Sequence, residues 1–162
     1  MVTMTDALKA EVLRVAAESS PSFVLPLRVY YEDTDAGGIV YYANYLRFAE
    51  RARTEMLRDL GFENSALMGD AGLAFAVRSC GIEYLKPALL DDRLEVHTQV
   101  LRIGGASLEM EQIVRRNGDA IAELNVKLVC MHVSGSSAGR PSRIPADIRA
   151  ALENHSGLAS EK

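Results

Sequence analysis

The chain has 162 residues, a length typical of a single domain that can bury a hydrophobic core. Apolar residues make up 48% and charged residues 25%, which is the composition of an ordinary globular protein. The formal net charge of −4 argues against a domain built mainly to bind nucleic acid, because such domains are strongly basic. A local basic patch for a phosphorylated ligand is compatible with this charge.

No apolar run is long enough for a helix to cross a bilayer, so the sequence predicts no transmembrane segment. The N-terminal residues carry charges throughout and lack the apolar region of a signal peptide. The two cysteines, Cys80 and Cys130, fit no metal-binding spacing, and each lies in an apolar, strand-like run. We therefore expect two buried free thiols and a reducing, cytoplasmic location.

In chain order, residues 1–20 indicate a short amphipathic helix or a loose extension before a single domain over residues 21–153. The run FVLPLRVYYED predicts an extended strand, because it is rich in β-branched and aromatic residues. A long helix is predicted over residues 42–60, where apolar side chains recur every three or four positions. Gly61 is the expected C-terminal stop, since glycine readily adopts the left-handed backbone that ends many helices.

After residue 72 the pattern predicts four strands, in the runs GLAFAVRSCGIEYL, RLEVHTQVLRI, ASLEMEQIVRR and AIAELNVKLVCMHV. Gly81 suggests a bulge in the first of these, and the glycines at 104–105 suggest a tight connection. The Asn117-Gly118 pair is a strong hairpin signal, because both turn positions need a positive φ.

A short helix is expected over residues 145–153, followed by a flexible tail over residues 154–162. The whole order predicts an α+β fold in which a curved antiparallel β-sheet wraps one long central helix. One helix covers one face of such a sheet, yet the end of the last strand is apolar on its other face as well. A second copy of the chain is the expected partner for that apolar remainder, which comprises Val129, Met131 and Val133.

The stretch YYEDTDAGGIVYYANYLRF combines two acidic residues, a glycine pair and the start of the long helix. The first amides of a helix lack intrahelical acceptors and carry partial positive charge, so they can bind an oxygen on which negative charge develops. Gly37 and Gly38 let the backbone turn tightly between the acids, Asp33 and Asp35, and that helix start. A carboxylate beside such amides can support acyl-transfer hydrolysis, whereas aspartate before glycine is also ordinary turn and capping chemistry.

The run from Tyr30 to Gly61, with its D-x-x-G-I-V-Y-x-x-N-Y core, resembles the signature of the 4-hydroxybenzoyl-CoA thioesterase family of hotdog-fold proteins. It is most similar to the branch called Tol–Pal system-associated acyl-CoA thioesterase. The match is dense over residues 28–60 and continues more loosely, through GIEYLKPALLDDRLEV, to about residue 145. The resemblance implies a hotdog fold and the hydrolysis of acyl-CoA thioesters to free acid and CoA.

Carried over by position, the family's catalytic aspartate falls on Asp35, which would act as nucleophile or general base towards the thioester carbonyl carbon. The main-chain donor that polarises the carbonyl falls on Tyr42, and Gly37 and Gly38 occupy the family's turn. Many members of the branch carry histidine where this chain has Tyr42. A phenol, with an unperturbed pKa of about 10, replaces imidazole poorly near neutral pH, so Tyr42 is expected to contribute its N–H.

Other polar residues are weaker candidates for the chemistry. Asp33 is the rival carboxylate, whereas Glu50 is expected to pair with an arginine of the helix. His97 is expected at the surface, His132 in the core or an interface, and His155 in the tail. No grouping of His, Cys, Asp and Glu has metal-ligand spacing, so we expect no metal and no cofactor, CoA being part of the substrate.

A CoA ester carries phosphates, so basic side chains are expected near the pocket mouth, although a solvated charge is the usual state of each one. The candidate substrate-binding residues are Tyr45, Arg78, Lys86 and Arg143. The resemblance implies a homodimer at least and points to a homotetramer, with acyl carrier protein as a further candidate partner.

Two other hypotheses stay open. In the first, the chain is a non-catalytic or weakly active hotdog scaffold that binds acyl carrier protein or a cell-envelope partner, and the departure at Tyr42 motivates it. In the second, the chain is a hydratase or dehydratase. That chemistry in related folds uses a histidine paired with an acid, and no histidine lies near the helix start.

Overall fold

The structure, a computed structural model, describes residues 21–158; the predicted extension over residues 1–20 and the last four residues lie outside this range. The elements are β1 (Phe23–Arg28), the short 3₁₀ turn η1 (Tyr31–Asp33), α2 (Asn44–Asp59), α3 (Asn64–Ala71), β2 (Leu73–Tyr84), β3 (Arg93–Ile103), β4 (Ser107–Arg116), β5 (Asp119–His132) and α4 (Ala146–Ser156).

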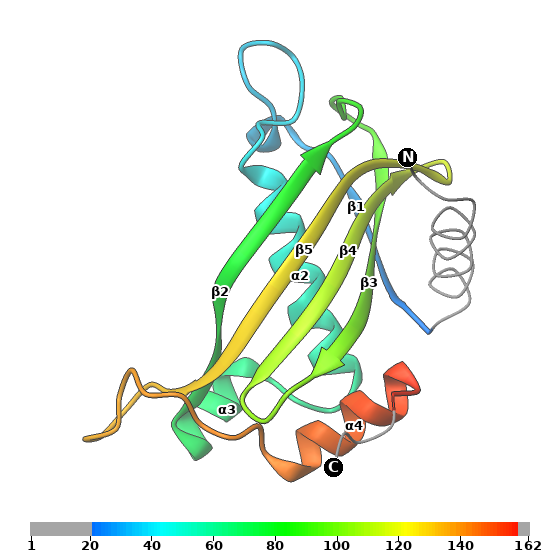
Figure 1. The fold of residues 1–162 in the computed structure, drawn as a ribbon. Coiled ribbons are helices and arrows are strands. Elements are labelled where there is room, and N and C mark those ends of the chain that lie inside the picture. Colours follow the sequence, from blue (N-terminus) through cyan, green and yellow to red (C-terminus); the bar gives the residue numbers. More distant parts are fainter. Residues whose placement is uncertain (1–20, 159–162) are drawn as a thin grey trace, which may run out of the picture.

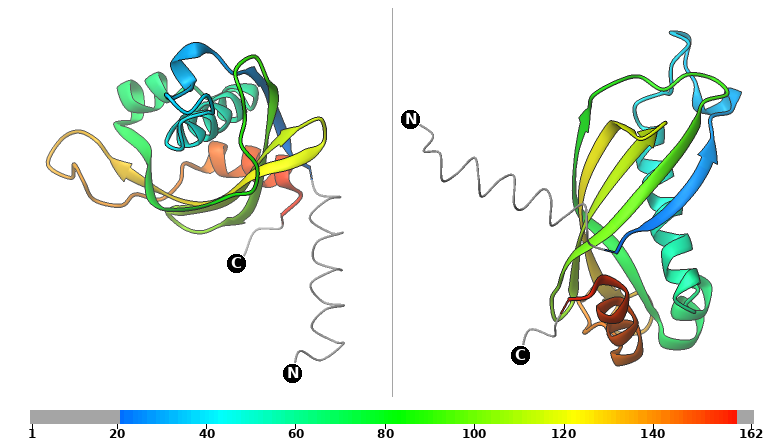
Figure 2. Two further views of the ribbon diagram at one scale, coloured as in Figure 1. Left: turned by 90° about the horizontal axis from the view of Figure 1, so that it is seen from above. Right: turned by 90° about the vertical axis from the view of Figure 1, so that its right-hand side faces the viewer.

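The five strands form one antiparallel sheet in the order β1-β3-β4-β5-β2. The sheet curves around α2, which lies along its concave face, while α3 and α4 lie at the opposite end of the molecule from the start of α2 (Figures 1 and 2). This is the α+β hotdog arrangement that the sequence predicts. The chain therefore places the turn at residues 33–43, the start of α2 and the end of β2 at one end of the sheet.

The helix α2 buries one face against the sheet, with Tyr45, Ala49, Ala52, Met56 and Leu57 on it as the spacing predicts. Three positions differ from that prediction. Phe48 is buried with 1% of its surface exposed, whereas Tyr42 and Leu46, which the apolar spacing places on the buried face, are exposed. Phe48 packs edge-on against Tyr45, with ring centroids 6.0 Å apart.

A buried polar chain fixes α2 on the sheet. The fully buried Gln112 of β4 donates from Nε2 to the Ala49 carbonyl and to Thr98 Oγ1, both at 2.9 Å. Arg53 on α2 donates to Gln112 Oε1 at 2.8 Å, and burial lowers the pKa of its guanidinium. Buried amides left without partners are costly, so these bonds set the helix in one position and with it the location of its first turn.

The predicted stop at Gly61 is confirmed. Gly61 has φ of +94°, its N–H donates to the Arg58 carbonyl at 2.9 Å, and the Phe62 N–H donates to the Leu57 carbonyl at 2.9 Å. This is the double closure of a Schellman motif, which satisfies the last carbonyls of the helix. The following helix α3 was not predicted, because NSALMGDA has no strong apolar period and contains Gly69.

The predicted turns between the strands are confirmed. Asn117 and Gly118 have φ of +51° and +85°, and the Gly104 N–H closes the β3–β4 connection on the Ser107 carbonyl at 2.8 Å. The bulge predicted at Gly81 was misplaced. Gly81 pairs regularly with β5, and the register of β2 shifts at Arg78 instead.

Two further predictions are corrected by the structure. Cys130 is buried and free as expected, but Cys80 is exposed, because it lies on β2 at the edge of the sheet. The final helix α4 continues through Ser156, which is buried, so the tail begins later than residue 154 and His155 is helical. At the end of β5, Val129 and Met131 are half-buried and Val133 is exposed.

Within residues 21–158, no helix combines the length and the apolar character needed to cross a bilayer.

Candidate active site

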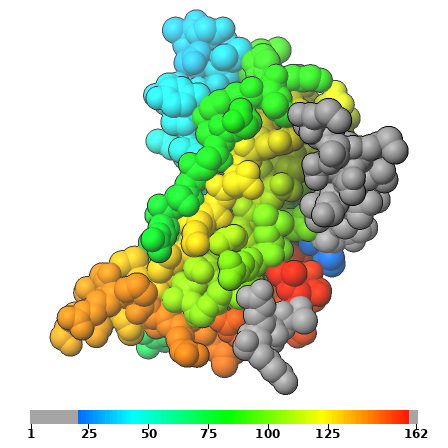
Figure 3. All heavy atoms as spheres, in the orientation of Figure 1, coloured from blue at the N-terminus to red at the C-terminus, as the bar shows by residue number. Residues whose placement is uncertain are grey.

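Asp35 lies in a tight turn that projects from the end of the molecule, beside the end of β2 (Figures 1 and 3). An antiparallel bridge between Thr34 and Val40 forms its base, and the Asp35 N–H donates to the Ile39 carbonyl at 3.0 Å. The Gly38 N–H closes the turn on the Asp35 carbonyl at 3.0 Å, and Gly38 has φ of +77°. The glycine turn expected after Asp35 is therefore present, and Gly38 adopts the positive φ that this turn requires.

One oxygen of the Asp35 carboxylate is fixed, and the other has no hydrogen-bond partner among the described residues. The Gly37 N–H donates to Asp35 Oδ1 at 2.8 Å. A Cβ at position 37 would stand 3.0 Å from this oxygen, so glycine permits the close approach. Asp35 is exposed and lines a pocket of about 450 Å³, and the carboxylate is thus oriented, hydrated and accessible to a ligand.

Asp33, the rival carboxylate, has a structural role. Its side chain is buried, and Oδ2 accepts the Tyr30 N–H at 2.8 Å. Its carbonyl oxygen accepts two further bonds at 2.8 Å, from the Tyr41 N–H and from Asn44 Nδ2. Asp33 therefore ties the 3₁₀ turn to the start of α2 and does not line the pocket.

The helix α2 begins at Asn44, two residues later than predicted, because a turn closed by the Asn44 N–H on the Tyr41 carbonyl precedes it. Tyr42 and Ala43 lie inside this turn. Within residues 21–158, neither of their N–H groups has a hydrogen-bond acceptor. The open amide predicted at Tyr42 is present, in the turn that leads into the helix and not in the helix itself.

Two side chains hold this turn in place. Asn44 Nδ2 bonds the Asp33 carbonyl, and the Tyr84 hydroxyl at the end of β2 donates to the Tyr42 carbonyl at 2.9 Å. Burial raises the pKa of Tyr84, so its hydroxyl keeps the donated proton at neutral pH. Sequence reasoning did not find Tyr84. Its only signal was an aromatic residue at the end of a strand, 42 positions from the carbonyl that it contacts.

The pocket is lined largely by aromatic and apolar side chains, comprising Ile39, Val40, Tyr42, Tyr45, Tyr84, Leu85 and Pro87 in addition to Asp35 and Lys86. Tyr45, a predicted substrate-binding residue, is buried in its wall. Its hydroxyl oxygen accepts the Ala88 N–H at 3.2 Å, and burial raises its pKa. Its ring stands edge-on to that of Tyr84, with centroids 5.5 Å apart. This wall suits an apolar acyl group.

Residues 85–87, the first of the loop over residues 85–92, line the pocket, and Arg116 holds this loop. The Arg116 guanidinium donates to the Pro87 carbonyl at 3.1 Å and to Asp92 Oδ2 at 2.6 Å. Burial disfavours the charged form of Asp92, but the Leu89 N–H and Arg116 outweigh it and lower the Asp92 pKa. The carboxylate is therefore ionised at neutral pH and braces the loop.

The predicted basic residues do not all meet at the pocket. Lys86 lines it, with Nζ 3.4 Å from Asp119 Oδ2 in an exposed ion pair. Arg78 lies at the bulge of β2 and Arg143 in the segment before α4, and neither lines the pocket of this chain. Glu50 accepts a hydrogen bond from Thr54 at 2.8 Å rather than from an arginine.

No histidine lines this pocket. His97, half-buried on β3, has Nε2 3.0 Å from Glu95 Oε2, and His132 is half-buried at the end of β5. Among residues 21–158, no three His, Cys, Asp or Glu side chains are grouped so as to hold a metal ion.

The geometry supplies the two parts that acyl transfer requires. Asp35 and Tyr42, whose N–H is open, line one pocket. The open amides of Tyr42 and Ala43 directly precede α2, where the helix dipole adds partial positive charge. The amides can stabilise an oxyanion, and the carboxylate can attack the carbonyl carbon or activate water.

Comparison with known proteins shows the family of the chain. The model of the thioesterase-like superfamily matches residues 29–152. The chain belongs to this superfamily. It is 43% identical to the acyl-CoA thioesterase YbgC of Haemophilus influenzae over 132 residues, which cover 82% of this chain and 95% of the relative. It is 50% identical to the acyl-CoA thioester hydrolase YbgC of Escherichia coli strain CFT073 over 110 residues, 67% of this chain and 81% of the relative.

Solved structures share the fold. The crystal structure of a probable thioesterase from Bartonella henselae superposes with a TM-score of 0.72 at 37% identity, covering 76% of this chain and 99% of that one. The hotdog fold and the thioesterase family predicted from the sequence are thus confirmed. The Tol–Pal branch stays a prediction.

Proposed function

We propose that this thioesterase hydrolyses acyl-CoA thioesters to a free acid and CoA, with Asp35 as the nucleophile or general base. The amide of Tyr42, with that of Ala43 beside it, is the proposed donor to the carbonyl oxygen. The observation that carries the proposal is that the Asp35 carboxylate and this open-amide turn border the same apolar pocket. The names of the YbgC relatives support the substrate class.

Two routes are consistent with this geometry. As general base, Asp35 takes a proton from water while the water oxygen attacks the carbonyl carbon, and the C–S bond then breaks to release the thiolate. As nucleophile, a carboxylate oxygen displaces the thiolate to form an acyl anhydride, which water then hydrolyses. In both routes the amides stabilise the negative charge on the carbonyl oxygen.

The replacement of the branch's histidine by Tyr42 is compatible with either route. A thiol has an unperturbed pKa of about 8.5, so the thiolate leaves near neutral pH without strong assistance from an acid. The Tyr84 hydroxyl holds the Tyr42 carbonyl, and Tyr42 is 62% exposed. The role assigned to Tyr42 is that of its N–H.

The test is an assay against a panel of aliphatic and aromatic acyl-CoAs, with wild-type protein and Asp35→Asn. The proposal expects turnover of at least one ester by the wild type and a loss of about 10²–10⁴-fold in kcat in the variant, with the melting temperature unchanged. Retention of most activity by the variant would refute the role of Asp35. Negligible kcat/KM on every ester, for the wild type, would instead support the scaffold hypothesis.

We also propose that a second copy pairs with β2. This strand has 12 residues and lies at the edge of the sheet, with one side unpaired among the described strands. Val77, Cys80, Tyr84 and Leu85 are exposed along it and just beyond it. A long apolar edge favours pairing with another chain. Pairing through β2 predicts a homodimer as the smallest assembly. A homotetramer stays a candidate assembly, and acyl carrier protein stays a candidate partner.

A further inference from the structure

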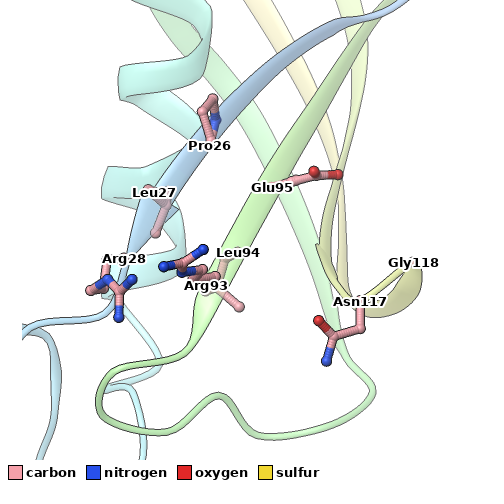
Figure 4. A pocket seen from close by; sticks show the side chains of 8 residues that line it. All are labelled: Pro26, Leu27, Arg28, Arg93, Leu94, Glu95, Asn117 and Gly118. Atoms are coloured by element: carbon pink, nitrogen blue, oxygen red, sulfur yellow. The ribbon is translucent and has the colours of Figure 1, made fainter.

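A second pocket, of about 490 Å³, lies where β1, the start of β3 and the β4–β5 hairpin meet (Figure 4). Its lining shares no residue with the acyl pocket, and it differs in character. Pro26 supplies exposed apolar surface and Leu27 is half-buried, whereas Arg28, Arg93, Glu95 and the hairpin pair Asn117-Gly118 supply polar groups.

The two arginines of this pocket stand directly opposite each other. Arg28 and Arg93 are partners in the antiparallel register of β1 and β3, so their side chains share one face of the sheet. Both are exposed, and Figure 4 shows the two guanidinium groups side by side. Like charges placed directly across an antiparallel pair destabilise it, so this arrangement has a cost in the free chain.

No carboxylate of the described residues neutralises the pair. Arg28 Nη1 donates to the Asp91 carbonyl oxygen at 3.3 Å, and Arg93 makes no ion pair or side-chain hydrogen bond within residues 21–158. Glu95, the one acid of the lining, lies 3.0 Å from the His97 ring and points away from the guanidinium groups (Figure 4). An anion between the arginines would remove the repulsion.

The hairpin adds a neutral donor opposite the arginines. Asn117 has φ of +51°, and its amide projects from the turn on the other side of the pocket (Figure 4). Arg115 steadies this turn by donating from Nη1 to the Gly118 carbonyl at 2.9 Å. An anion in the pocket can thus be approached by two guanidinium forks and by an amide.

We propose that Arg28, Arg93 and Asn117 form a binding site for a phosphate-bearing small molecule, separate from the acyl pocket. A phosphate group carries up to two negative charges on tetrahedrally placed oxygens, so it can neutralise both arginines, whereas a carboxylate neutralises one. The volume of about 490 Å³ leaves room for an attached organic group. The net charge of −4 disfavours a polyanion such as nucleic acid as the ligand.

The phosphate can come from two sources. One is the phosphorylated end of the thioester's carrier, in which case the site extends the proposed substrate-binding surface. The other is a free nucleotide or phosphometabolite. The site itself does not depend on the chemistry assigned to Asp35, and its occupancy is measured without turnover.

The first experiment measures binding of pyrophosphate and ADP by calorimetry at low ionic strength, where charge interactions are screened least. The full chain is compared with Arg28→Gln, Arg93→Gln, the double variant and the control Arg51→Gln. Arg51 is exposed on α2 and has no ion pair or side-chain hydrogen bond within residues 21–158, so its variant matches the loss of charge.

The expected result is binding by the wild type and by Arg51→Gln, and a Kd raised about 10-fold or more in each single pocket variant. Without ligand, each pocket variant should also melt at the same or a slightly higher temperature, because one of two like charges that face each other has been removed. Absence of pyrophosphate and ADP binding to the wild type at millimolar concentration would overturn the proposal. Equal binding by the wild type and the double variant would do so as well.

Kinetic measurements distinguish the two sources of the phosphate group. If the carrier end of the thioester occupies the site, Arg93→Gln raises KM for acyl-CoA without lowering kcat, and ADP competes with acyl-CoA. If a free phosphate compound occupies it, KM is unchanged while ADP binding still depends on Arg93. Either result supports the site, and Asp35→Asn should leave pyrophosphate binding unchanged.

Discussion

At its C-terminal end α2 satisfies its last carbonyl groups within the local chain, whereas the turn at its N-terminal end leaves two amides open. The Gly61 and Phe62 amides close the first end on Arg58 and Leu57. Within residues 21–158, the Tyr42 and Ala43 amides at the other end have no acceptor. A helix end of the first kind contributes stability, and one of the second kind can bind an oxyanion.

The two ends also differ in what holds them. Residues within six positions of one another make the closed end. The open end is held by groups distant in sequence, with Asn44 bonding the Asp33 carbonyl and Tyr84 bonding the Tyr42 carbonyl from the end of β2. The amides at the open end therefore stay without acceptors because tertiary contacts hold the peptide planes of the turn and no side chain caps the N–H groups.

Among the substitutions that test the two ends of α2, Asn44→Ala should have the largest effect, because it releases the open end. The substitution removes the buried bond to the Asp33 carbonyl, which should lower the free energy of unfolding by about 1–3 kcal/mol. Displacement of the turn from Asp35 should also lower kcat by about 10–100-fold. The matched control is Asn64→Ala at the start of α3, where the side chain is exposed. Equal kcat values for the two variants would contradict the account.

Gly61→Ala tests the closed end. A residue with a Cβ is strained at φ of +94°, so the free energy of unfolding in urea should fall by about 1–2 kcal/mol while kcat stays within about twofold. Gly69→Ala, inside α3 with open space around the added Cβ, should instead raise stability by about 0.5–1 kcal/mol. A large loss of kcat in Gly61→Ala would show that the two ends are not separate in function.

Asp92→Asn weakens the hold of Arg116 on the loop over residues 85–92, which lies beside the open end of α2. It removes an ion pair with Arg116, so the free energy of unfolding should fall by about 1 kcal/mol at neutral pH. The Asp92 pKa is lowered in the folded protein, so this contribution is fully present above the unfolded value of about 3.9 and is lost as the pH falls through the folded pKa. The stability difference between variant and wild type should therefore shrink in acid. A difference that stays constant down to pH 2 would exclude this ion pair as its origin.

Tyr84→Phe should have the smallest effect. It deletes only the hydroxyl that holds the Tyr42 carbonyl, so we expect kcat to fall about fivefold with KM nearly unchanged. Tyr31→Phe is the control, because Tyr31 is 82% exposed. If both variants keep wild-type kcat, the hydroxyl of Tyr84 does not position the turn.

The features that the sequence predicts well are those decided by neighbouring residues. Asp35 with Gly37 and Gly38 forms the turn that local chemistry dictates, Gly61 ends the helix, and Asn117-Gly118 makes the hairpin. Each needs a positive φ or a short-range bond that few residue types supply.

The features that it missed depend on contacts between distant segments. The start of α2 moves to Asn44 because Asp33 holds Tyr41, and Tyr84 reaches the site from another strand. The exposure of Cys80 follows from its place on an edge strand, and the apposition of Arg28 with Arg93 follows from strand register. Neither strand order nor register can be derived from local propensity.

The most direct test of the open end is a crystal structure of Asp35→Asn with a bound acyl-CoA. The account predicts that the thioester carbonyl oxygen lies about 2.7–3.1 Å from the N–H nitrogen of Tyr42 or Ala43, with the side chain at position 35 facing the carbonyl carbon. A thioester bound with its carbonyl away from these amides, or outside the pocket beside Tyr45 and Tyr84, would contradict it.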